Sequence, residues 1–86
     1  MRSVILRRPR SLADVPVGTY VLATLDPPDE WHGIVPFTVV GRVAKHGNGN
    51  GTEPEIALSY PSYTNHGIPV HRVVWIPLSR IENVLN

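Results

Sequence analysis

The chain has no cysteine, which excludes a disulfide framework and a thiolate metal site. Small secreted domains usually depend on such cross-links, so their absence favours the cytoplasm as the location. Hydrophobic runs are also short, because the N-terminal segment has only three consecutive apolar residues, Val4 to Leu6, before two arginines. A signal peptide needs an apolar run of about 7 to 15 residues and a membrane span about 20. We therefore expect neither, and no membrane partner.

Charge is scarce and unevenly placed. Charged residues make up 17% of the chain, against about 25% in typical soluble domains, while 42% are hydrophobic, too many for a disordered chain. Half of the eight basic residues lie in the first ten positions, namely Arg2, Arg7, Arg8 and Arg10. Residues 11–86 hold four basic and all seven acidic residues, a net charge of −3. The sequence thus predicts a basic N-terminal arm or short edge strand over 1–10 and one domain over 11–86.

The basic arm suits nucleic acid, because each arginine that neutralises a phosphate releases counterions and makes the affinity salt-dependent. A solvated terminal tail is the alternative, and the acidic balance of residues 11–86 opposes nucleic-acid binding.

Helical periodicity is missing, since nine prolines and seven glycines fall throughout the chain. Alternating patterns instead predict strands over 17–25, 33–45, 55–60 and 68–76. The side chains expected to face inward on the first three are Val17, Val21, Ala23 and Leu25, then Val35, Phe37, Val39 and Val43, then Ile56, Leu58 and Tyr60. The Asn-Gly pairs of 46–54 predict a hairpin tip. Pro77 predicts a helical turn, followed by a short strand or a few more helical residues.

These elements predict an all-β fold: a small five-stranded barrel with one short helical turn near the C-terminus, because a twisted sheet of this size covers its edges by curling. The stretches "VGTYV" (17–21), "WHGIV" (31–35) and "IPLSRI" (76–81), in this order, resemble SH3-like barrels, in which a one-turn helix separates the last two strands. The resemblance spans residues 16–84 and concerns layout. It implies the fold and leaves the function open.

Two enzyme families with such a barrel share short stretches with this chain. "GTYV", "WHGIV" and "IPLSRIENV" resemble the plasmid-type trimethoprim-resistant dihydrofolate reductases, in which a Gln-Ile-Tyr stretch on the penultimate strand lines a pore shared by four subunits. Here "RVVWI" (72–76) stands in that place, with neither Gln nor Tyr, so the activity is not carried over. "GTYVLATLDPP" (18–28) is similar to the first strand of ribonuclease toxins, whose catalytic positions have no match here.

The segment 68–76 poses a packing problem, because it carries large apolar side chains on both faces. Val70, Val74 and Ile76 share one side, whereas Val73 and Trp75 share the other. The pattern does not decide which side is buried. Monomers seldom expose an apolar patch of more than a few hundred Å², so we predict a homo-oligomer with a symmetric subunit contact through this strand. The loops 27–33 and 60–69 are expected near its rim.

Aromatic residues near polar ones define the expected binding site. Two tryptophans and three tyrosines exceed what a narrow barrel encloses, so some must face outward. The candidate residues for binding a ligand or partner are Trp31, His32, Tyr60, Tyr63, His71, Arg72 and Trp75. Among the polar residues, Arg42, Arg72 and His71 suit an anionic ligand such as a nucleotide.

No pattern of catalytic or metal-ligating residues is recognisable. The four histidines lack the spacing of a zinc site, and neither GxSxG nor HExxH occurs. We predict no catalytic residue, metal or cofactor, and a non-enzymatic, self-associating module that binds a protein, nucleic acid or small anionic ligand. It would suit an accessory or inhibitor protein of bacterial or phage type. The alternative is a small oligomeric enzyme of reductase or ribonuclease type with its active site at an interface.

Overall fold

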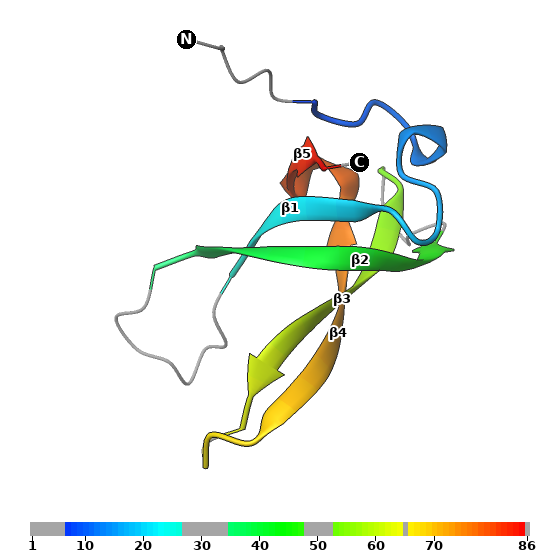
Figure 1. Ribbon diagram of the computed structural model, residues 1–86. Helices are drawn as coiled ribbons and strands as arrows, with labels where there is room; N and C mark the ends of the chain where they lie inside the picture. The colour runs from blue at the N-terminus through cyan, green and yellow to red at the C-terminus, as the bar shows by residue number, and fades with distance from the viewer. Residues whose placement is uncertain (1–6, 27–34, 48–52, 65, 86) are drawn as a thin grey trace, which may run out of the picture.

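The computed structural model describes residues 7–26, 35–47, 53–64 and 66–85, which form one curved antiparallel sheet (Figure 1). Its strands are β1 (Tyr20–Leu25), β2 (Phe37–Gly47), β3 (Glu55–Tyr63), β4 (Pro69–Pro77) and β5 (Ile81–Val84), in the order β4-β3-β2-β1-β5. Single 3-10 turns are η1 (Leu12–Asp14), before β1, and η2 (Leu78–Arg80), between β4 and β5. The predicted all-β class and late helical turn are confirmed. Among the described residues β4 and β5 do not pair, so the barrel-like sheet is open.

The core lies on the inner face of the curved sheet. It consists of one continuous cluster of buried aliphatic side chains: Val15, Val21, Ala23, Leu25, Val43, Ile56, Leu58, Ile76, Leu78, Ile81 and Val84. The predicted alternation is confirmed in β1. In β3, Ile56 and Leu58 belong to the core as predicted, and Ala57 between them is buried as well. Burial of this cluster is the main source of stability, because so small a domain has one core to build.

Two residues that the sequence placed inward are exposed. Val17 is 58% and Val35 73% exposed. β1 begins only at Tyr20, after Gly18 has turned the chain with a φ of +98°, and β2 begins at Phe37. Val17 and Val35 therefore precede the paired strands and do not share their alternation.

The structure decides which face of β4 is buried. Ile76 is 5% exposed and Val74 packs against the core, whereas Val73 and Trp75 are 63% and 51% exposed on the outer face. The indole of Trp75 extends over β2, where a Cβ on Gly47 would lie 2.6 Å from the ring. Because Gly47 has no Cβ, the large ring can pack against β2 on the outer face, outside the core.

Two backbone hydrogen bonds, one at each end of the β3–β4 ladder, show which residues of the two strands bond to each other. The Thr64 N–H donates to the Ile68 carbonyl at 2.9 Å, and the Leu78 N–H donates to the Pro54 carbonyl at 3.0 Å. The register between these ends is unbroken. Because hydrogen-bonded and non-hydrogen-bonded pairs alternate in an antiparallel ladder, the even-numbered residues of β3 and β4 bond to each other. The backbone groups of the odd-numbered residues point away from this ladder.

Pro61 ends the pairing of β3 with β2. The sequence predicted a loop from this residue, yet β3 continues through it to Tyr63. Pro61 is odd-numbered, so its nitrogen faces β2, and proline has no N–H to donate. The paired register of β2 and β3 extends no further in this direction than Arg42 and Ser59. The end of the β3–β4 hairpin, residues 60–64 and 66–72, therefore projects beyond β2 (Figure 1).

Gly41 offers a test of how closely β2 and β3 cross. A Cβ there would lie 2.8 Å from both Leu58 Cγ and the Ser59 carbonyl oxygen, and Leu58 is fully buried. Neither neighbour can move freely, so Gly41→Ala should lower the free energy of unfolding by about 1–3 kcal/mol, measured by urea denaturation.

The matched control is Gly47→Ala, which meets the half-exposed ring of Trp75. That ring can swing into solvent, so a smaller loss is expected. Equal unfolding midpoints for the two variants would contradict the close crossing at Gly41.

Candidate functional site

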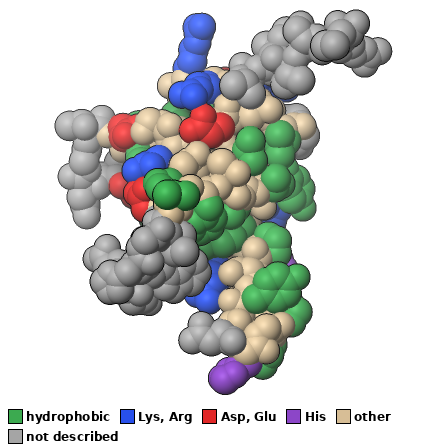
Figure 2. Space-filling view, turned by 90° about the vertical axis from the view of Figure 1, so that its left-hand side faces the viewer, with side chains coloured by type: hydrophobic (Ala, Val, Ile, Leu, Met, Phe, Trp, Pro, Cys, Tyr) green, Lys and Arg blue, Asp and Glu red, His purple; other side chains and the backbone are tan. Residues whose placement is uncertain are grey.

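Within the described ranges, the sheet does not close between its edge strands β4 and β5, and we call this gap the seam. A cleft of about 620 Å³ opens there, between β4 and the adjacent ends of β1 and β2. It lies where the hairpin end leaves the body, and Figure 2 shows hydrophobic side chains gathered on the flank of the body just above the projecting hairpin. Pro61 creates this space indirectly, because the hairpin end is no longer held against β2.

The floor of the cleft is apolar. Leu25 and Ile76 are both 5% exposed and belong to the core. Phe37, Tyr60 and Val74 are half-buried and pack against that core while they line the cleft. An apolar surface that is continuous with the core and open to solvent suits the aliphatic or planar body of a ligand.

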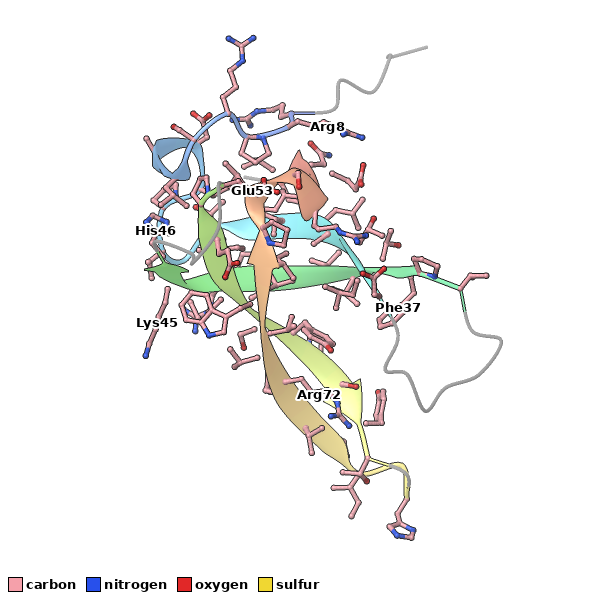
Figure 3. The ribbon with its side chains drawn as sticks, turned by 180° about the vertical axis from the view of Figure 1, so that it is seen from behind. Arg8, Phe37, Lys45, His46, Glu53 and Arg72 are labelled. Carbon is pink, nitrogen blue, oxygen red and sulfur yellow. The ribbon has the colours of Figure 1, made fainter. Side chains whose placement is uncertain are left out.

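Arg72 supplies a cation at the edge of this floor. It lies opposite Tyr60 in the β3–β4 register, and its Nε donates to Ser62 Oγ at 3.2 Å. Its Nη2 donates to the Tyr63 carbonyl at 3.4 Å. In Figure 3, Arg72 and Phe37 point into the angle between hairpin and body. Neutral groups hold the guanidinium, and no carboxylate of the described residues pairs with it.

The opposite rim of the cleft carries an ion pair. Arg80 of η2 donates from Nη2 to Asp26 Oδ2 at 2.8 Å, just beyond the end of β1. These two charges compensate each other. Arg72 is then the charge without an ionic partner among the described residues that line the cleft.

The structure brings together only part of the predicted site. Tyr60 and Arg72 line the cleft. Trp75 also borders it, but its indole ring lies on the outer face over Gly47. Tyr63, which is 67% exposed, and His71 belong to the outer face. Trp31 and His32 lie outside the described residues.

Most of the lining residues were not predicted as site residues, among them Phe37, Val74 and Arg80. Phe37 and Val74 were assigned to strand faces, and Arg80 carried no signal. Arg80 reaches the cleft because η2 turns the chain back toward the end of β1. The spacing of residues within one segment does not predict which distant segments come together, so Arg80 could not be identified from the sequence.

The described part of the basic arm covers the edge of β5. The Val84 N–H donates to the Arg7 carbonyl at 2.9 Å, and the Arg7 N–H donates to Asn83 Oδ1 at 2.9 Å. Arg8 is neutralised by Glu82, with 2.7 Å between Nη2 and Oε2. Arg2 lies outside the described residues, and nucleic-acid binding by Arg7, Arg8 and Arg10 stays a prediction.

Comparison with known protein families, curated proteins and solved structures returned no significant match. In the ranges that the structure covers, no three His, Asp or Glu side chains gather as a metal site requires. Nor does any helix within those ranges have the length and apolarity to cross a membrane. The assignment of a function therefore depends on the chemistry of the cleft.

The Arg80–Asp26 pair should contribute little to stability, because its side chains are 41% and 61% exposed. Asp26→Asn is expected to change the free energy of unfolding by less than about 1 kcal/mol, measured by urea denaturation. A loss of several kcal/mol would show that the pair holds the seam together and would disqualify this variant as a probe of the cleft.

Proposed function

We propose that this protein is a non-enzymatic binding module whose cleft holds an organic anion. The negative group of the ligand pairs with Arg72, and its planar or aliphatic body lies on the floor formed by Phe37, Tyr60 and Val74. The observation that carries the proposal is the position of Arg72 at the border of an apolar floor, without a carboxylate partner among the described residues.

The size and charge of the cleft favour a small ligand. Its volume of about 620 Å³ falls within the range of about 300–1,000 Å³ that small-molecule sites occupy. One unpaired arginine matches one anionic group, whereas a nucleic-acid strand needs a track of cations along successive phosphates. A nucleoside monophosphate combines one phosphate with a planar base and is therefore a suitable probe.

The layout of the strands supports the further proposal that the domain is an SH3-like barrel with an open seam. The strand order β4-β3-β2-β1-β5 and the single 3-10 turn between β4 and β5 fit that arrangement. The proposed ligand site lies at the seam, where the sheet does not close on itself.

The charged groups of the cleft support binding over catalysis. Arg72 and Arg80 line it, and a guanidinium is suited to binding a carboxylate or phosphate group. Asp26, the carboxylate among the described lining residues, is engaged by Arg80. A general acid or base needs a group that is free to exchange its proton.

A panel of matched ligands tests the function. Adenosine 5′-monophosphate, guanosine 5′-monophosphate and 1-naphthyl phosphate are compared by calorimetry with adenosine, guanosine and 1-naphthol. At least one anion should bind about 10–100-fold more tightly than its neutral counterpart, the range expected for a charge-assisted hydrogen bond. Arg72→Gln should remove that difference. The proposal fails if no pair shows a preference for the charged ligand.

Two further variants separate a specific site from general attraction of anions. Arg42→Gln makes the same charge change at an exposed residue that pairs in register with Tyr20 on the outer face, and should leave the affinity unchanged. Asp26→Asn frees Arg80 and should raise the affinity a few-fold. Equal losses in the Arg42 and Arg72 variants would contradict a defined site.

A further inference from the structure

The outer edge of β4 offers backbone hydrogen-bonding groups. The alternation of the β3–β4 ladder directs the N–H and C=O groups of His71, Val73 and Trp75 away from β3. No backbone group of the described residues pairs with them. Pro69 and Pro77, at the two ends of β4, share this direction and have no N–H. The open edge is therefore a short, bounded segment with three donors.

The side chains of this segment are apolar and exposed. Val73 and Trp75 are 63% and 51% exposed on the outer face. Natural proteins protect edge strands with charges, prolines, bulges or a covering segment. The opposite edge, on β5, is covered by Arg7, whereas no described segment covers β4, which has prolines at its two ends. An apolar strand with an uncovered edge is suited to pairing with another strand.

We propose that β4 pairs along this edge with β4 of a second copy of the chain, antiparallel, about a twofold axis at Val73. Val73 then lies opposite the same residue of the second copy, and His71 lies opposite the second copy's Trp75. All three N–H groups of each strand find acceptors within the paired segment. Pro69 of one copy lies opposite Pro77 of the other at each end of the paired segment. Neither residue has an N–H, so no donor is left without an acceptor there.

Charge and side-chain fit favour a second copy as the occupant. In this register Arg72 lies opposite Val74 of the other strand and Val70 lies opposite Ile76, so no like charges face each other. A shift by two residues toward Pro69 would place Arg72 opposite Arg72, which is unfavourable. In the proposed register, the side chains of one copy of β4 therefore fit those of the other copy without a clash of like charges.

The dimer should be reversible. Nine residues of strand extend over about 30 Å, so the pairing buries less than the roughly 800 Å² per partner of a stable interface. The proposal does not depend on a ligand in the cleft, because its hydrogen bonds come from the backbone groups of His71, Val73 and Trp75. Arg72→Gln leaves these groups in place and removes a charge that faces Val74 in the proposed register, so the dimer should still form, which keeps the two proposals separable.

Light scattering across a dilution series tests the pairing. The mass of the wild-type chain should rise with concentration from 9.5 kDa toward twice that value. Val73→Pro removes only an N–H that faces the open edge, which an edge strand tolerates, and should stay monomeric. Val73→Thr keeps the N–H and the branched shape and should dimerise like the wild type. A wild-type monomer at every concentration, or unaltered dimerisation of Val73→Pro, would overturn the proposal.

A crosslink gives an independent reading if Val73→Pro does not fold. Because the chain has no cysteine, single-cysteine variants report one contact each. Opposed residues of a hydrogen-bonded pair have Cα atoms about 5.5 Å apart, within disulfide range. Oxidised Val73→Cys should form a covalent dimer. Val40→Cys, at an exposed position of β2, should not; equal crosslinking of both variants would count against the proposed register.

Discussion

The positions of three prolines in one hairpin determine how the sheet ends. Pro61, Pro69 and Pro77 are all odd-numbered residues of the β3–β4 pair, and its hydrogen bonds run between even-numbered residues. None of the three therefore costs this ladder a hydrogen bond. Pro61 instead withholds a donor from β2, whereas Pro69 and Pro77 withhold donors from the outer edge of β4. The hydrogen bonds within the hairpin can therefore run without a break. Fewer N–H donors are left to bond with β2 on one side and with a further strand beside β4 on the other.

The cleft follows from the same constraint. Since β3 parts from β2 after Ser59, the hairpin end stands away from the body and exposes the side of Phe37, Tyr60 and Val74. These residues extend the core to the surface. Arg72 then lies at the border of an apolar floor, where a guanidinium held by neutral groups favours an anion.

Strand alternation predicts much of the core from sequence, because Val21, Ala23, Leu25, Ile56 and Leu58 face inward as expected. It fails at Val17 and Val35, since the paired strands begin later than the pattern does. The sequence also located the helical turn near Pro77, although Pro77 itself is the extended residue before the turn, which begins at Leu78.

The face of β4 could not be predicted, since both faces are apolar. A glycine on a different strand decides it, because Gly47 leaves room for the ring of Trp75 on the outer face. The candidate site was predicted only in part, since it joins segments that lie far apart in the sequence. Tyr60 and Arg72 stand out by residue type, whereas Arg80 enters through contacts between distant segments. Local spacing carries information on side-chain direction and none on which strand ends meet.

β4 bonds to β3 through its even-numbered residues and leaves the backbone groups of its odd-numbered ones open. Amide hydrogen exchange followed by NMR on a dilute sample measures this residue by residue. We expect slow exchange for Val70, Arg72, Val74 and Ile76, and fast exchange for His71, Val73 and Trp75. Uniform protection from His71 to Ile76 in the monomer would contradict it, because the edge would then be closed by the chain itself.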